Sequence, residues 1–356
     1  MSVTPLLTAF LLSLVLSMLL IPALIRFGYR YEIMDLPGRH KRHKNPTPVL
    51  GGVALFLAVW LTMSVICIFF GDFCRELPGS LLFILCGAIV VLLVGLSDDL
   101  RPLPAWVKLA AQVAAGLLLY LGGLKIELLS IPFRSVDVGG ISVAVTVLWV
   151  VILTNAVNLI DGLDGLACGV SFIGALYLLA VGQMYQVGVV LVLILILIGF
   201  LGPFWYYNRH PARVFLGDSG SMQVGYYFAV FSLMVPLKSF TATALYVPLL
   251  ALGVPIMEVM VSVVRRLARG KSILRADRRH LFHYLTLLGF SRRQVIVTFY
   301  SLGGIYGLFA LAMFYWNRLV VFGFLLLFMV VIFGVFFILL TKFSLRKRLN
   351  GRNGRI

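Results

Sequence analysis

The sequence predicts an all-α polytopic membrane protein, and its composition, its long apolar runs and its loop charges each support that fold class. Of the 356 residues, 61% are hydrophobic and 12% are charged, and the mean hydropathy is +1.05. A soluble globular chain has about 45–50% apolar and about 25% charged residues. Here the apolar residues form runs of roughly 17–25, long enough to span the hydrocarbon layer as helices. A soluble globular domain is therefore excluded.

We predict eleven membrane-spanning helices in a single integral membrane domain over residues 1–341, followed by a basic cytoplasmic tail over residues 342–356. No Lys or Arg precedes the first apolar run. The chain therefore lacks the basic region of a cleavable signal peptide, and we expect the first helix to be retained. The predicted segments are 5–25, 48–70, 80–97, 105–123, 141–159, 165–182, 187–207, 219–237, 242–263, 294–315 and 319–341.

Basic residues are distributed unequally between the loops. The loops after segments 1, 3, 5, 7 and 9, together with the tail, hold 24 of the 30 Lys and Arg residues, and the other loops hold five. The remaining one, Lys108, lies inside the fourth segment. The positive-inside rule therefore predicts an outside N-terminus and a cytoplasmic C-terminus. Most of the net charge of +17 then faces anionic lipid headgroups, so we expect membrane lipids and no nucleic acid among the partners.

The four cysteines predict no covalent framework. Cys67, Cys86 and Cys168 fall inside apolar runs, Cys74 lies in a loop, and no CxxC pair occurs. We expect small buried apolar side chains, with neither a disulfide framework nor a thiolate metal site.

Most of the thirteen acidic residues lie on or near the predicted cytoplasmic face, and four polar clusters stand out there. They are Asp98-Asp99; NAVNLIDGLDGLA, with Asn155, Asn158, Asp161 and Asp164; NRHPARVFLGDSGS, with Asn208, Phe215 and Asp218; and ADRRHLFHYL, with Asp277, His280 and His283.

Taken singly, each cluster has a simpler structural explanation. One Asn or Asp and a glycine would cap a helix end, and Asp218 or Ser219 could cap a helix start. Asp98-Asp99 could be a solvated pair, and the two histidines could lie on an interfacial helix. Residues 155, 158 and 161, however, share one helix face, and a single cap does not need three polar residues.

Taken together, the clusters place hard oxygen ligands, a phosphate-compatible helix start, basic residues and histidine on one membrane face. Mg²⁺ favours one or two carboxylates plus substrate phosphates. Phosphoryl transfer needs mainly positioning and charge neutralisation. The sequence thus predicts Mg²⁺-dependent transfer of a phosphate-bearing group, with Mn²⁺ as the alternative ion.

These motifs, in this order, resemble the polyprenyl-phosphate N-acetylhexosamine-1-phosphate transferases. The resemblance runs from MDLPGRHKRHKNPTPVLGG (Met34–Gly52) to about Gln294 and looks closest to the bacterial branch that makes undecaprenyl-diphosphate-N-acetylglucosamine. It implies that a UDP-amino sugar gives its sugar 1-phosphate to undecaprenyl phosphate and releases UMP. It also implies a homodimer in the bacterial cytoplasmic membrane, with a cytoplasmic active site. The product would start a cell-envelope glycan such as lipopolysaccharide O-antigen or teichoic acid.

The resemblance also implies roles for individual residues. Asp98 matches the acid that deprotonates the lipid phosphate, Asp218 matches the Mg²⁺ ligand, and Phe215 suits stacking on uracil. The implied catalytic residues are Asp98, Asp99, Asp161, Asp164, His280 and His283. The implied substrate-binding residues are Lys41, Arg42, Lys44, Asn155, Asn158, Asn208, Phe215 and Arg278.

One departure and several alternatives remain. Phe282 stands where this branch has the middle histidine of its HxHH pattern, which leaves the donor sugar open. The muramyl-pentapeptide branch is similar but carries a triple-His motif there. From other classes, a secondary transporter would place polar groups near the bilayer midplane, a phosphatidyltransferase would have Ala-Arg after its first Asp-Gly, and a structural scaffold would leave the acidic clusters unexplained.

Overall fold

The long apolar runs form helices because backbone N–H and C=O groups in lipid must be bonded within their own segment. A computed structural model describes residues 3–36, 45–71, 79–131, 134–185, 188–234, 252–267 and 281–353. Its helices are α1 (Val3–Arg30), α2 (Gly51–Phe69), α4 (Leu81–Leu100), α5 (Ala105–Leu121), α6 (Ser142–Ile160), α7 (Leu166–Tyr185), α8 (Gly188–Asn208), α9 (Gly217–Met234), α11 (Gly253–Leu267), α12 (Leu281–Leu287), α13 (Arg292–Tyr315) and α14 (Arg318–Asn353).

Two short antiparallel hairpins join the helices. Strand β1 (Met34–Asp35) pairs with β2 (Thr47–Pro48), and β3 (Leu128–Ile131) pairs with β4 (Arg134–Asp137). The first hairpin brackets the basic run, whose residues Lys41, Arg42 and Lys44 lie outside the described part of the chain.

The structure confirms an all-α integral membrane protein. Each of the eleven predicted segments contains a helix, although residues 242–251 of the ninth lie outside the described residues. Eight helices of the described chain are long and apolar enough to cross a bilayer: α1, α2, α4, α6, α7, α8, α13 and the first part of α14. The helices α5 and α11 are apolar but shorter. The predicted tail continues α14 as a helix to Asn353.

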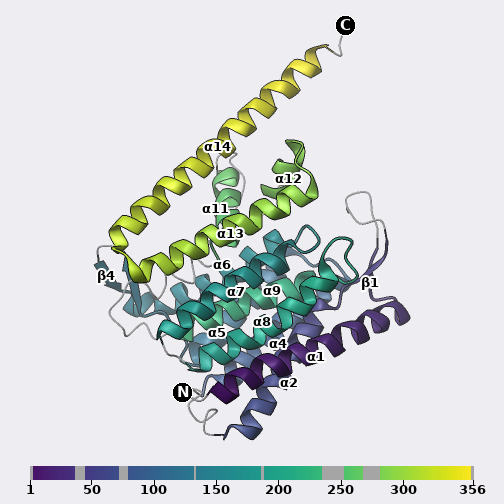
Figure 1. The fold of residues 1–356 in the computed structure, drawn as a ribbon, viewed down its shortest axis with the longest axis vertical. Helices are drawn as coiled ribbons and strands as arrows, with labels where there is room; N and C mark the ends of the chain where they lie inside the picture. Colours follow the sequence, from purple (N-terminus) through teal and green to yellow (C-terminus); the bar gives the residue numbers. More distant parts are fainter. Residues whose placement is uncertain are drawn as a thin grey trace.

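The centre of the bundle is α9. Every residue from Ser219 to Leu233 is buried, and the helix packs against α2, α4 and α6. Around this core, α5 packs between α4 and α6, while α8 packs on α1 and α7. The long helices run in roughly the same direction in Figure 1, and α14 (yellow) extends beyond the others toward the C-terminus. Because protein surrounds α9, its polar residues do not meet lipid.

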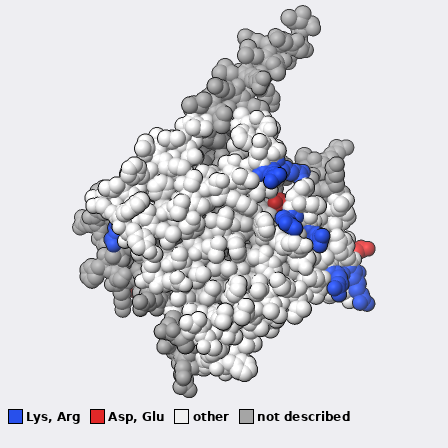
Figure 2. Space-filling view, viewed as in Figure 1, with Lys and Arg blue, Asp and Glu red and all other residues white. Residues whose placement is uncertain are grey.

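The surface shows the separation of apolar and charged residues expected in a bilayer. In Figure 2 most of the Lys and Arg in view lie near the right-hand edge, the side on which Figure 1 shows β1. The wide middle of this face carries neither sign of charge. A belt of uncharged side chains is what contact with lipid tails requires.

One cysteine differs from the expectation. Cys67, near the end of α2, is disulfide-bonded, whereas Cys86 and Cys168 are free. The expectation of no disulfide framework was therefore wrong at Cys67, because position within an apolar run does not prevent a thiol near a helix end from forming a disulfide.

Candidate active site

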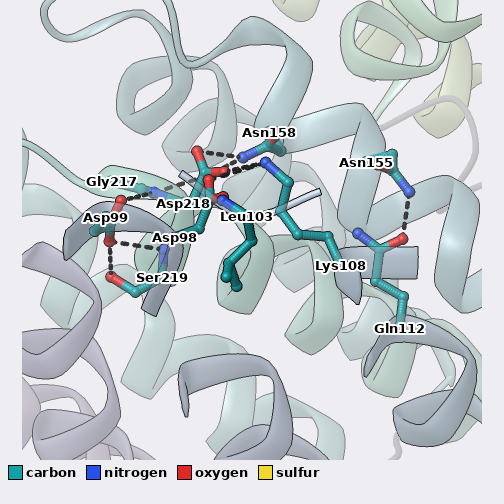
Figure 3. A network of polar contacts seen from close by, with 11 residues as sticks. Asp98, Asp99, Leu103, Lys108, Gln112, Asn155, Asn158, Gly217, Asp218 and Ser219 are labelled. Carbon is teal, nitrogen blue, oxygen red and sulfur yellow. Dashed lines mark hydrogen bonds and ion pairs between the residues drawn. The ribbon is translucent and has the colours of Figure 1, made fainter. Parts of the chain in front are cut away.

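A single lysine joins two of the predicted acidic clusters. Asp98, in the last turn of α4, and Asp218, in the first turn of α9, both accept from Lys108 of α5 (Figure 3). The Lys108 Nζ lies 3.0 Å from Asp98 Oδ2 and 2.7 Å from Asp218 Oδ2. The three side chains are 13%, 25% and 29% exposed for Asp98, Lys108 and Asp218, so a substrate can reach them. The ammonium offsets the repulsion of two neighbouring carboxylates.

Asn158 brings a fourth helix to this centre. From the last turns of α6 its Nδ2 donates to Asp218 Oδ1 at 3.0 Å and contacts Ser221 Oγ at 3.0 Å. Both oxygens of Asp218 therefore have a donor, one from Lys108 and one from Asn158. The Asp218 carboxylate is held in one orientation by residues far apart in the sequence.

Asp99 caps the start of α9. Its Oδ1 accepts from the Asp218 N–H at 2.7 Å, and its Oδ2 accepts from the N–H and hydroxyl of Ser219 at 3.1 and 2.6 Å. The first N–H groups of a helix have no partner within it, and a carboxylate there also meets the positive end of the helix dipole. The adjacent acids thus differ in their contacts: Asp98 faces Lys108, and Asp99 holds the backbone that carries Asp218.

Gly217 allows the Asp99 side chain to come close to the start of α9. Its φ of +73° is disfavoured for residues with a side chain, and a Cβ would lie 2.6 Å from Asp99 Oδ2. The glycine thus meets both the backbone conformation and the close contact that bring Asp99 onto α9.

A second polar pair lies one helical turn away from the lysine. Asn155 Nδ2 contacts Gln112 Oε1 at 2.5 Å (Figure 3). Gln112 follows Lys108 by four residues on α5, and Asn155 precedes Asn158 by three on α6, so the two pairs continue along the α5–α6 contact. The predicted substrate-binding Asn155 is thus bonded to a buried glutamine.

Asp161 ends α6 and lies near the other acids. Burial raises the pKa of its carboxyl well above the usual range, and the charges of Asp218, Asp99 and Asp164 raise that pKa further. No hydrogen-bond donor to this carboxylate occurs among the described residues. A bound cation would therefore stabilise the ionised form of the Asp161 carboxylate.

The loop after Asp161 is held by α8 and α13. Asp164 Oδ2 lies 2.6 Å from Nδ1 of His210, a residue that sequence reasoning did not select. Asn208 accepts from the Gly165 N–H at 3.0 Å and donates to the Val214 carbonyl at 2.8 Å. The Tyr300 hydroxyl donates to the Gly165 carbonyl at 2.6 Å. Buried Asn208 therefore braces two loops, and its predicted nucleotide contact stays a prediction.

Phe215 connects the β1–β2 hairpin to the site. Its N–H donates to the Pro48 carbonyl at 2.9 Å, and its carbonyl accepts from the Gly51 N–H at 3.1 Å. The segment that follows the basic run is therefore tied to the loop that leads into Asp218.

The histidine motif is described only in part. His280 and Arg278 lie outside the described residues, whereas His283 lies on α12 with its ring centroid 4.2 Å from that of Phe282. Phe282 lies against Gly162, in the loop that carries Asp161 and Asp164. The structure therefore brings His283 close to this loop.

The donor groups fit a hard divalent ion that shares its coordination with substrate. No group of three His, Cys, Asp or Glu side chains in the described ranges forms a ready metal site. Mg²⁺, however, uses one or two carboxylates plus phosphate oxygens and water. Asp218 could supply one such carboxylate. Asp161, whose carboxylate has no hydrogen-bond donor among the described residues, could supply the other.

Comparisons with known proteins show the family to which the chain belongs. The pattern of glycosyl transferase family 4 matches residues 81–236, which include Asp98, Asp161 and Asp218. The chain is 33% identical over 358 residues to a probable undecaprenyl-phosphate N-acetylglucosaminyl 1-phosphate transferase of Bacillus subtilis, with 97% of each chain covered. It is 31% identical to a decaprenyl-phosphate N-acetylglucosaminephosphotransferase of Mycobacterium leprae, covering 81% of this chain and 78% of the relative. It is 30% identical to a phospho-N-acetylmuramoyl-pentapeptide-transferase of Staphylococcus aureus, covering 86% and 97%.

The fold and the site define an integral membrane phosphotransferase whose polar centre lies at the ends of its helices. The chain belongs to glycosyl transferase family 4, within the polyprenyl-phosphate N-acetylhexosamine-1-phosphate transferases. Its activity is sugar-phosphate transfer to a polyprenyl phosphate carrier in a membrane. Because the chain belongs to this family, we no longer consider it as a secondary transporter, a phosphatidyltransferase or a structural scaffold.

Proposed function

We propose that the chain transfers an N-acetylhexosamine 1-phosphate from a UDP-sugar to undecaprenyl phosphate, giving undecaprenyl-diphosphate-sugar and UMP. An oxygen of the lipid phosphate forms a bond to the β-phosphorus of the UDP-sugar. The bond from this phosphorus to the bridging oxygen breaks, and UMP leaves with that oxygen. The observation that carries the proposal is the Asp98–Lys108–Asp218 bridge, in which three helices present a cation between two reachable carboxylates.

The residues of this bridge have complementary roles in the proposal. Asp98 takes the proton that remains on the lipid phosphate. A phosphate monoester has a second pKa of about 6, so it is mostly ionised at neutral pH and needs no strong base. Lys108 balances phosphate charge as the two substrates approach, and Asn158 and Asp99 hold Asp218 in place.

A divalent ion completes the proposed site. When bound, Mg²⁺, or Mn²⁺ in its place, would be held by Asp218 with Asp161 and would neutralise charge on the diphosphate. We assign donor binding to Lys41, Arg42, Lys44, Asn155, Phe215 and Arg278.

We place the reaction on the cytoplasmic side of a bacterial cytoplasmic membrane. The site lies where α4 and α6 end and α5 and α9 begin, and the sequence assigns these helix ends to the basic side. Nucleotide sugars are made in the cytoplasm, so this orientation gives the donor direct access. We also retain the homodimer as a proposal, which analytical ultracentrifugation in detergent would test.

The proposed donor is a plain or modified UDP-N-acetylhexosamine. The alternative is UDP-N-acetylmuramoyl-pentapeptide, because the Staphylococcus aureus relative is a phospho-N-acetylmuramoyl-pentapeptide-transferase. Against it, Leu281 and Phe282 are apolar and buried in the segment where the muramyl branch has its triple-His motif. The side chains that this segment offers to the donor nucleotide sugar therefore differ between the two branches.

The test is transfer by the purified full-length protein in detergent with undecaprenyl phosphate and Mg²⁺. The donors would be UDP-N-acetylglucosamine, UDP-N-acetylgalactosamine, a UDP-N-acetylfucosamine and UDP-N-acetylmuramoyl-pentapeptide. We expect UMP release and lipid-linked product with one of the first three. Product from the muramyl donor alone would establish the alternative, and no product from any of the four would refute the proposal.

A further inference from the structure

A buried acid outside the lysine bridge contacts the histidine-bearing helix. Glu258 lies within α11, and its side chain is fully buried (0% exposed). Burying a carboxylate is costly unless it is hydrogen-bonded or paired. Its carboxylate therefore has a reason to be there beyond packing.

Glu258 caps α12. Both of its carboxylate oxygens accept from the Leu281 N–H, at 3.0 Å for Oε1 and 3.1 Å for Oε2. Leu281 is the first residue of α12, where N–H groups have no partner in the helix. A carboxylate also favours this end of the helix dipole. The first turn of α12 is thus tied to α11.

The next residue ties the same turn to the aspartate loop. Phe282 is 2% exposed, and a Cβ on Gly162 would overlap its ring. The Phe282 ring also contacts the His283 ring at 4.2 Å between centroids. His283 is therefore placed by two contacts on adjoining residues, one from α11 and one from the loop between Asp161 and Asp164.

We propose that Glu258 and Phe282 are positioning residues that dock α12 on the Gly162 loop and so place His283 for the transfer reaction. The proposal rests on the proposed function for the role of His283. It also explains why position 282 carries phenylalanine instead of the middle histidine of the HxHH pattern. A buried histidine would need a hydrogen-bond partner, whereas a phenylalanine ring packs on glycine without one.

The docking itself is tested by hydrogen–deuterium exchange of the full-length protein in detergent, a measurement that needs no turnover. In Glu258→Ala we expect exchange in the 281–287 peptide to rise at least about tenfold. Glu258→Gln keeps an acceptor of the same length and should show a smaller rise. Glu127→Ala is the matched control, because Glu127 is an exposed acid paired with Lys125. Unchanged exchange in Glu258→Ala would overturn the proposal.

The link to His283 is tested by a double-mutant cycle on the transfer rate. Glu258→Ala should lower kcat by about 10²-fold, the loss expected for a misplaced catalytic group, with a smaller change in KM. In a His283→Ala background the same substitution should have little further effect. Independent, multiplicative losses would show that Glu258 does not act through His283. If the wild-type protein transfers no sugar, the proposed function fails while the exchange result still decides the docking.

The Phe282 contact has its own test. Gly162→Ala should lower both the rate and the thermal stability, because its methyl group meets the ring, and Phe282→Ala should restore part of both losses. Gly304→Ala on α13 is the control, since no atom lies within 4 Å of a Cβ there. An equal effect of Gly162→Ala with and without Phe282 would refute the contact.

Discussion

The Nζ of Lys108 lies 2.7 Å from the Oδ2 of Asp218, although the two residues are 110 positions apart in the sequence. The same ammonium lies 3.0 Å from Asp98, so one cation joins the end of α4 to the start of α9. Two carboxylates this close would otherwise repel. One ammonium therefore offsets the repulsion between the two carboxylates before any substrate binds.

Replacing Lys108 should remove the positive charge that offsets this repulsion. We expect Lys108→Met to lower kcat by about 10²–10³-fold, since it removes a cation aimed at phosphate charge. Lys108→Arg should recover only part of the rate, because guanidinium and ammonium differ in shape. Steady-state UMP release measures both. Lys125→Met, at the exposed pair with Glu127, is the control and should keep the wild-type rate. A fully active Lys108→Met would remove this lysine from the site.

Asp99 should act mainly through the position of α9. Asp99→Ala leaves the N–H groups of Asp218 and Ser219 without their cap, and we expect a loss of about 1–2 kcal/mol in the free energy of unfolding. Activity should fall together with the melting temperature. Asp99→Asn keeps one acceptor oxygen, so its stability and activity should lie between those of the wild-type protein and those of Asp99→Ala. A variant with wild-type melting and no activity would instead assign Asp99 to the chemistry.

Asp161 should make stability depend on pH. Its folded-state pKa is raised above the ordinary 3.8 by burial and by the charges of Asp218, Asp99 and Asp164. Between these two pKa values the folded protein binds more protons than the unfolded chain, so stability falls as pH rises through that window. Thermal unfolding without divalent ions, from about pH 4 to about pH 8, measures the slope.

The matched variant is Asp161→Asn, which should flatten the slope. Added Mg²⁺ should also reduce it in the wild-type protein, because a bound cation favours the ionised carboxylate. An unchanged slope in Asp161→Asn would show that other groups titrate.

Divalent ions should be required for turnover. Chelation with EDTA should abolish exchange of labelled UMP into the UDP-sugar, and added Mg²⁺ should restore it. Asp218→Ala and Asp98→Asn should each abolish this exchange in folded protein. Asp137→Asn is the control, because Asp137 is an exposed residue of β4. Normal exchange in either site variant would remove that residue from its role.

Much of the fold and part of the site were predictable from the sequence. Each predicted apolar run contains a helix, and eight helices of the described chain are long and apolar enough to cross a bilayer, because length and apolarity decide whether a helix can span lipid. The motif residues Asp98, Asn158 and Asp218 meet as expected, each at the end of a helix. The spacing of residues within a motif predicted which of them share a helix face. It did not predict which residues of another helix they contact.

The residues that were missed depend on those partners. Lys108 lay inside an apolar run, and its cost in lipid was the one signal that pointed to function. Nothing local distinguished His210, which contacts Asp164 from the segment after α8. The different roles of Asp98 and Asp99 follow from the position of α9, which the sequence does not give.

The burial of α9 has a consequence for biogenesis. The helix begins with polar residues and contains Gln223, whose amide donates to the Gly52 carbonyl of α2 at 2.9 Å. Such a segment gains little from lipid on its own, so its insertion depends on helices that have already entered the bilayer. We therefore expect the reaction centre of the nascent chain to form only after α2, α4 and α6 have entered the bilayer and can surround α9.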